Sequence, residues 1–142
     1  MFKTIYPTKS NTIYSQFSEK NAGKDQILDL IKISSGEPAI EGDETTNYAE
    51  TYNSRILLQF DLSEISSSIH SGKIGSNFYS YLTLKATSVQ NLSLDYTIYA
   101  YPISGSWTQG KGFANSNPFS SDGSSWKYRD SKLQGTQWST SS

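Results

Sequence analysis

The chain has 142 residues, 18% of them charged, and its formal net charge is −1. This balance gives no electrostatic basis for binding nucleic acid or an anionic membrane. The absence of cysteine excludes disulfides, thiolate chemistry and cysteine-based zinc sites. No apolar run approaches the roughly 20 residues of a membrane-spanning helix. The length suits one domain with a substantial core, and the many aromatic residues argue against disorder.

The first part of the chain predicts three short strands. Residues 2–6 alternate and end at a proline, which is typical of an edge strand. Residues 11–17 alternate again and predict a second strand. Asn21-Ala22-Gly23-Lys24 is a turn signal, because its glycine can adopt positive φ. Residues 26–33 predict a third strand, with a short helix as the alternative, because their apolar side chains fit both periods.

A long loop is predicted at residues 34–52. It holds an acidic cluster that includes Glu41, Asp43 and Glu44. Carboxylate oxygens are the ligands that calcium prefers, but the spacing does not match an EF-hand loop. A solvated acidic loop is therefore the favoured interpretation, and we expect no bound metal.

The strongest strand signal lies at residues 54–63, the most apolar run of the chain. Its two faces carry Ile56, Leu58, Phe60 and Leu62 on one side, and Arg55, Leu57, Gln59 and Asp61 on the other. We expect the first face to be buried and the second to be partly covered. We also expect Arg55 to bridge to an acidic group at the sheet rim and Asp61 to cap the following turn.

A short helix and two further strands are predicted next. Residues 64–71 have helical spacing, with Ser63 placed to cap the start. Residues 78–86 and 94–103 alternate as strands. One face of residues 78–86 carries Leu82, Leu84 and Ala86, and the other carries Tyr81, Thr83 and Lys85. One face of residues 94–103 carries Ile98 and Ala100, and the other carries Tyr99 and Tyr101.

From residue 104 onward the chain is rich in glycine and serine, yet it contains all three tryptophans. A flexible linker would not carry three residues that bury so much apolar area, so we expect ordered loops. The whole pattern predicts an all-β fold, an antiparallel β-sandwich or jelly roll with one short helical link and C-terminal loops rich in glycine and tryptophan. Residues 1–113 would form the sandwich domain, and residues 114–142 would pack on it or on a partner and lead into a longer chain.

The order of these pieces resembles the DNRLRE-type β-sandwich, a jelly-roll module of large surface and extracellular proteins. The matching pieces are Asn11-Thr12-Ile13-Tyr14, Asn21-Ala22-Gly23, residues 54–63, Tyr81-Leu82-Thr83-Leu84 and Trp107-Thr108-Gln109-Gly110. Residues 54–63 are the most specific of them, and the resemblance covers roughly residues 11 to 113. The closing strands of the family are missing after Trp138.

The C-terminal part is similar to structural proteins of tailed bacteriophages, in residues 104–112 and 123–130. In those proteins such a module often starts at the initiator methionine without a signal peptide, and residues 1–14 here lack the apolar stretch of a secretory signal. The resemblance implies a non-enzymatic virion component: a fibre, head-decoration or tail-associated protein. Its sandwich would dock onto other virion structural proteins, and the protein would form a homo-oligomer. No cofactor is expected.

The candidate contact residues for a partner or a glycan are Trp107, Trp126, Tyr128 and Trp138. Aromatic faces pair with the apolar faces of sugar rings, so a carbohydrate-binding module for host or cell-surface glycans is the alternative function. The competing interpretation is that these rings pack the core. An enzyme is the weakest hypothesis, because no paired carboxylates are placed by a motif and no nucleophile elbow surrounds any serine, although His70 is present.

Overall fold

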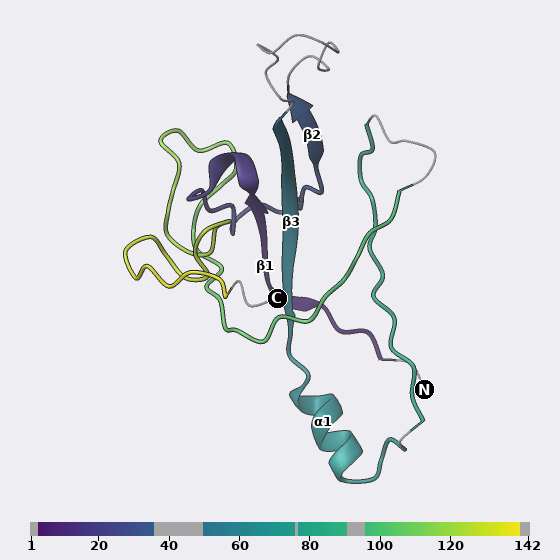
Figure 1. Cartoon of the computed structure of the whole chain (residues 1–142). Coiled ribbons are helices and arrows are strands. Elements are labelled where there is room, and N and C mark those ends of the chain that lie inside the picture. Colours follow the sequence, from purple (N-terminus) through teal and green to yellow (C-terminus); the bar gives the residue numbers. More distant parts are fainter. Residues whose placement is uncertain (1–2, 36–49, 76, 91–95, 140–142) are drawn as a thin grey trace. The chain divides into compact units, whose positions relative to one another are not determined.

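The computed structural model describes residues 3–35, 50–75, 77–90 and 96–139 (Figure 1). Most of the predicted loop at residues 34–52, including Glu41, Asp43 and Glu44, lies outside these ranges. The chain divides into two compact units. The first unit comprises Met1–Asp61 and Gly105–Ser142, and the second comprises Leu62–Ser104. The described part of residues 114–142 therefore shares a unit with the N-terminal strands.

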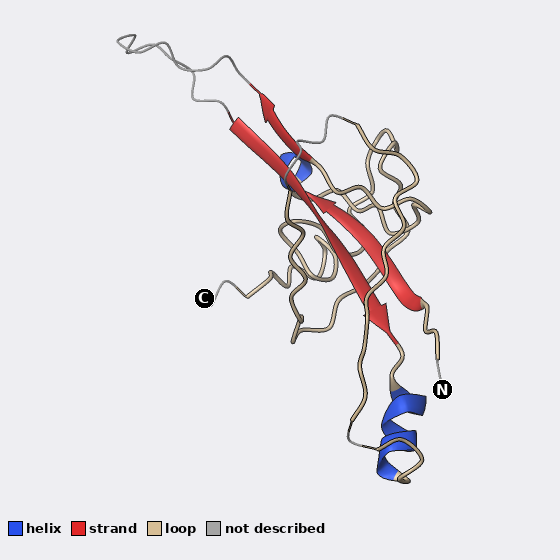
Figure 2. Ribbon diagram, turned by 90° about the vertical axis from the view of Figure 1, so that its right-hand side faces the viewer, coloured by secondary structure: helices blue, strands red, loops and turns tan. Residues whose placement is uncertain are grey.

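The first unit contains a three-stranded antiparallel sheet in the order β1-β3-β2 (Figure 2). The strands are β1 (Pro7–Tyr14), β2 (Lys32–Ser35) and β3 (Glu50–Phe60), and a 3-10 turn, η1 (Ser15–Phe17), follows β1. Strand β3 is central because it pairs on both sides. The apolar run predicted as the strongest strand is thus the middle of the sheet, although β3 begins at Glu50 and ends at Phe60.

The predictions for the N-terminal strands were wrong in their limits. The expected edge strand at residues 2–6 is not formed in its described residues, and Pro7 opens β1 instead of ending a strand. The first residue of a strand tolerates proline, which has no N–H to donate. At the other end, Ser15 Oγ accepts from the backbone N–H of Asn53 at 2.8 Å. Residues 15–17 turn there into η1 instead of continuing the strand.

Residues 26–31 form neither the predicted strand nor the alternative helix, and β2 begins only at Lys32. Side chains of the sheet hold this segment. The backbone N–H of Asp29 donates to Thr12 Oγ1 at 3.1 Å, and that of Ile31 donates to Ser54 Oγ at 2.7 Å. The Ser54 hydroxyl in turn donates to the carbonyl of Asp29 at 2.6 Å. Together with one backbone bond, from the Ser54 N–H to the Ile31 carbonyl at 2.9 Å, these side-chain bonds hold the segment without a regular backbone ladder.

The core of the first unit lies on the face of β3 that the sequence predicted to be only partly covered. Its buried residues are Ile13, Leu57 and Trp107, which are 3%, 5% and 6% exposed, with Trp126 and Trp138 packed against them. The opposite face, with Ile56, Leu58 and Phe60, is only half-buried. The prediction was wrong because alternation identifies two faces but not which one the C-terminal loops cover.

In the second unit, α1 (Ser63–His70) confirms the predicted helix to within a residue at each end. Ser63 is the first helical residue, whereas Leu62 takes the N-cap position, where no side chain caps the helix. The expected capping role of Ser63 is therefore wrong. Hydroxyls bond back along the helix, Ser67 Oγ to the Ser63 carbonyl and Ser68 Oγ to the Glu64 carbonyl, each at 2.8 Å. No helix in the described ranges is long and apolar enough to cross a bilayer.

The two predicted strands of the second unit are not formed as a ladder. The described residues 77–90 and 96–104 run in opposite directions without strand pairing (Figure 1). The described structure is therefore mostly sheet with one α-helix, which is compatible with an all-β fold. A second sheet layer is not formed among the described residues.

Tyr14 makes the folding of the first unit dependent on pH. Its hydroxyl donates to Asp29 Oδ2 at 2.8 Å. Burial and then the Asp29 carboxylate raise the pKa of this phenol above its ordinary value of 10.0. The folded state disfavours the phenolate, so the stabilisation is present below about pH 10 and is lost as the pH rises beyond it.

We expect the free energy of unfolding to fall more steeply above about pH 10 in the wild type than in Tyr14→Phe. Denaturant unfolding at a series of pH values from about 8 to 12 measures this difference. Every other titratable group is the same in the two proteins, so the comparison isolates Tyr14. Identical slopes in the two proteins would contradict the assignment.

Candidate functional site

The tryptophans predicted to contact a partner or glycan all lie in the first unit. Trp107 is buried in the core, so its ring packs against Ile13 and Leu57. Trp138 is half-buried, and its indole N–H donates to the Ser125 carbonyl at 2.8 Å. Trp126 is also half-buried. The structure brings the three rings together as one packing cluster around Leu57.

Arg55 does not form the predicted bridge to an acidic group among the described residues. Its guanidinium lies over the ring of Trp126, 4.5 Å from the centroid. Lys9 lies on the same sheet face and places its ammonium 5.9 Å from the Trp107 ring centroid. Such pairs are attractive because the ring face carries partial negative charge. The cations thus cover the outer sides of two indoles.

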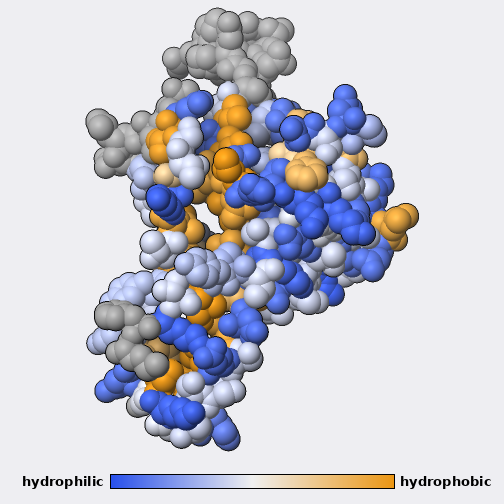
Figure 3. All heavy atoms as spheres, turned by 180° about the vertical axis from the view of Figure 1, so that it is seen from behind, coloured by the Kyte–Doolittle hydropathy of each residue, from blue (hydrophilic) through white to orange (hydrophobic). Residues whose placement is uncertain are grey.

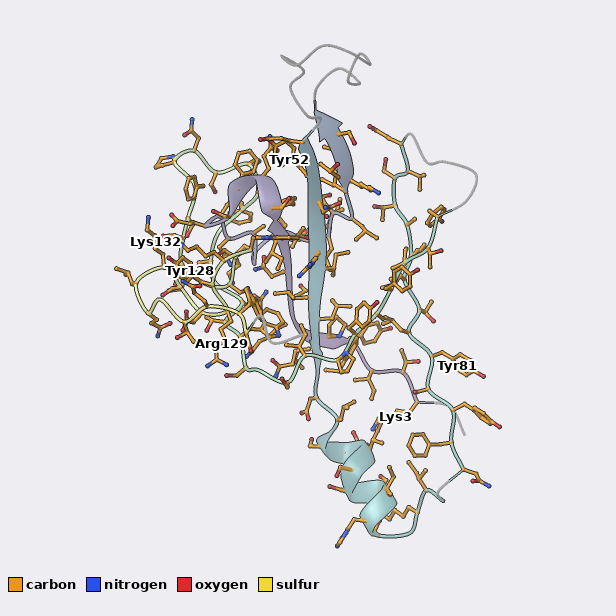
Figure 4. All side chains as sticks on the ribbon, in the orientation of Figure 1. Lys3, Tyr52, Tyr81, Tyr128, Arg129 and Lys132 are labelled. Atoms are coloured by element: carbon orange, nitrogen blue, oxygen red, sulfur yellow. The ribbon has the colours of Figure 1, made fainter. Side chains whose placement is uncertain are left out.

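Tyr128 is half-buried and lies on the C-terminal loops, which also carry Arg129 and Lys132 (Figure 4). Its carbonyl accepts from the Ser125 N–H at 2.7 Å, and its backbone bridges to Gln137. The Lys127 ammonium lies 5.2 Å from its ring centroid. Contact of Trp107, Trp126, Tyr128 or Trp138 with a ligand stays a prediction.

The most developed polar arrangement is a cluster of buried amides and hydroxyls that we call the asparagine cluster. Its members are Asn11, Asn21, Ser124 and the tight loops at Gly110 and Gly112. Asn11 Nδ2 donates to the Ser124 carbonyl at 2.9 Å and to Ser124 Oγ at 2.8 Å. Asn11 Oδ1 accepts from the Ala22 N–H at 3.2 Å. Strand β1 is thereby joined to the C-terminal loops.

Asn21 uses its whole hydrogen-bonding capacity. Its Nδ2 donates to the carbonyls of Gln109 and Ser124, each at 2.8 Å. Its Oδ1 accepts from the N–H groups of Gly112 at 2.9 Å and Gly23 at 3.2 Å. An amide has two donor hydrogens and one oxygen with two lone pairs, so every site is filled. No buried side-chain polar atom in the described ranges lacks a partner.

Glycine is required where the loops close around this amide. Gly110 has φ +80°, and a Cβ there would overlap the carbonyl oxygen of Asp122 and the side chain of Asn21. The side chain of Gln109 completes the contact by donating to the Gly23 carbonyl at 2.6 Å. Close backbone approach, and not ligand binding, therefore explains these glycines.

The sequence predicted a turn at residues 21–24 but did not reveal the role of Asn21. The available signal was the presence of two motifs in one chain, Asn-Ala-Gly at residues 21–23 and Trp-Thr-Gln-Gly at residues 107–110. Spacing alone does not reveal that the two loops meet.

Charged groups at the surface of the first unit form local pairs. Lys132 Nζ donates to Glu19 Oε2 at 2.7 Å, which lowers the pKa of the Glu19 carboxyl and raises that of the Lys132 ammonium. Hydrogen bonds from Thr136 and then Ser131 lower the pKa of the Asp130 carboxyl. His70 lies exposed in the last turn of α1, in the second unit. Among the described residues, no three acidic or histidine side chains gather as a metal site.

Exposed tyrosines in the second unit form the other candidate. Tyr79, Tyr81, Tyr99 and Tyr101 are 88%, 86%, 72% and 77% exposed. The rings of Tyr99 and Tyr101 stack with their centroids 6.1 Å apart and an angle of 18° between their planes. The sequence placed Tyr99 and Tyr101 on one strand face but did not single them out as contact residues.

Comparison with family models, curated proteins and solved structures returned no significant match.

Replacing Asn21 with aspartate should unfold the first unit readily. A carboxylate cannot donate, so it would face the carbonyls of Gln109 and Ser124 as a buried, unpaired charge. We expect a loss of about 3 to 5 kcal/mol in the free energy of unfolding at neutral pH, measured by denaturant titration.

Asn115→Asp is the matched control, because Asn115 is exposed on the same C-terminal loops and the change in charge is the same. It should shift stability by less than about 0.5 kcal/mol. Equal effects of the two substitutions would contradict the structural role of Asn21.

Proposed function

We propose that the chain is a non-enzymatic structural component of a tailed-bacteriophage virion: a fibre, head-decoration or tail-associated protein. In this proposal, residues 78–86 and 94–103 pair as strands and complete a β-sandwich of the DNRLRE type. The sandwich docks onto other virion structural proteins, and several copies associate. Two resemblances support this assignment: that of residues 54–63 to the DNRLRE-type module, and that of residues 104–112 and 123–130 to structural proteins of tailed bacteriophages.

The observation that carries the proposal is the exposure of aliphatic side chains at alternating positions of the second unit. Leu82 and Leu84 are each 53% exposed, and Ile98 is 50% exposed. Figure 3 shows hydrophobic side chains reaching the surface on one face of the protein. Full burial of such a side chain contributes about 1.5 to 3 kcal/mol, so covering its exposed half contributes roughly half of that. Burial of these side chains against a partner surface or a second layer would therefore stabilise the association.

Unpaired extended segments lead to the same expectation. Exposed strand edges present free N–H and C=O groups that pair readily with another chain. Two strands without a further layer are only marginally stable in water. Symmetric association of copies, or docking on a particle, protects such segments.

Leu84→Asp should therefore weaken association of the protein with itself or with the particle. A carboxylate on the aliphatic face would be buried without a partner when that face is covered. Thr83→Asp is the matched control, since Thr83 is an exposed neighbour on the opposite face. Native mass spectrometry of the purified protein should show a stable oligomer in the wild type and in Thr83→Asp, and a larger share of monomer in Leu84→Asp.

The proposed location in the virion is tested by mass spectrometry of purified virions and of the cell fraction. Peptides of this chain in intact particles are the expected result. A rigid monomer that is absent from every particle would overturn the proposal.

A further inference from the structure

The second unit has two chemically distinct kinds of exposed side chain. The aliphatic side chains at Leu82, Leu84 and Ile98 require an apolar cover, as argued above. The tyrosines alternate with them in sequence and are the more exposed group, with Tyr79, Tyr81, Tyr99 and Tyr101 between 72% and 88% exposed. Tyr81 projects outward from its ribbon (Figure 4). A phenol combines an apolar ring with a polar tip, so this set can remain in water and still bind a ligand.

Tyr99 and Tyr101 form the best defined part of this set. Their rings are close to parallel, 18° apart, and their centroids are separated by 6.1 Å. Both side chains are largely exposed, at 72% and 77%, so the ring faces that are turned away from each other are accessible to a ligand. Within the described ranges neither hydroxyl has a hydrogen-bond partner, so both phenols are open to a ligand.

The segment that carries the pair favours a neutral ligand. Residues 96–104 carry no charged side chain, and Thr97 adds a hydroxyl two residues before Tyr99. A nucleic acid or an anionic glycan would be expected to meet lysines and arginines here. A sugar ring offers C–H groups that stack on an aromatic face and hydroxyls that bond to phenols.

We propose that Tyr99 and Tyr101 form a stacking platform for a neutral oligosaccharide. This site is separate from the tryptophans, which pack around Leu57 in the first unit. It does not depend on a virion location, because the isolated chain would bind the sugar. In a particle, it would give the protein a means of contacting surface glycans.

The test is binding of cellohexaose, chitohexaose and maltohexaose to the full chain by calorimetry. We expect at least one of them to bind. Tyr99→Ala and Tyr101→Ala should each weaken that binding about tenfold, the effect of losing roughly 1.4 kcal/mol of stacking. Tyr99→Phe keeps the ring and should retain most of the affinity. Tyr6→Ala removes a tyrosine that is 78% exposed in the first unit and should leave binding unchanged.

Amide chemical-shift changes in the wild-type protein give a readout that needs no variant. Addition of the bound hexasaccharide should shift Tyr99, Tyr101 and their neighbours and leave the asparagine cluster unmoved. Failure of all three sugars to bind, or binding that both alanine variants retain in full, would overturn the proposal. Dissociation of an oligomer by Tyr99→Ala without any sugar binding would instead identify the tyrosine pair as a protein interface.

Discussion

The buried amide of Asn21 is the interaction on which the first unit depends. Four backbone groups converge on it, at Gly23, Gln109, Gly112 and Ser124. Three of these groups are 88 to 103 residues away from Asn21 along the chain, so bringing them to the amide costs considerable entropy. A fully satisfied buried amide recovers part of this cost and fixes one register, whereas a half-satisfied one would be worse than an apolar core.

This polar anchor has a direct consequence for the hydrophobic core. With Asn11 and Asn21 joined to Ser124, the C-terminal loops lie over the Leu57 face of the sheet. Trp107 then packs against Leu57, and the other two tryptophans close around it. The covered face is therefore set by hydrogen bonds at its edge. Apolar content alone would have favoured burial of the opposite face, which carries Ile56, Leu58 and Phe60.

The second unit presents the opposite situation. Its extended segments place Leu82, Leu84 and Ile98 at alternating positions, yet these side chains are about half exposed. The exposed tyrosines between them have a different chemistry, because a phenol tolerates water while an aliphatic side chain does not. The proposed apolar face for association and the proposed aromatic face for sugar are compatible in the same extended segments, because side chains alternate along an extended chain.

The sequence by itself determined the class of the elements: a central strand at residues 54–60, a helix after it, and ordered loops around the tryptophans. These follow from local periodicity and from the size of the indole ring, which are properties of neighbouring residues. It did not determine the limits of β1, the irregular course of residues 26–31 or the covered face of β3. Nor could it identify the role of Asn21. Those features depend on bonds such as Ser54 to Ile31 and Asn21 to Ser124, which join distant segments. Only tertiary structure brings such partners together, because a hydrogen bond depends on positions in space and leaves no period in the chain.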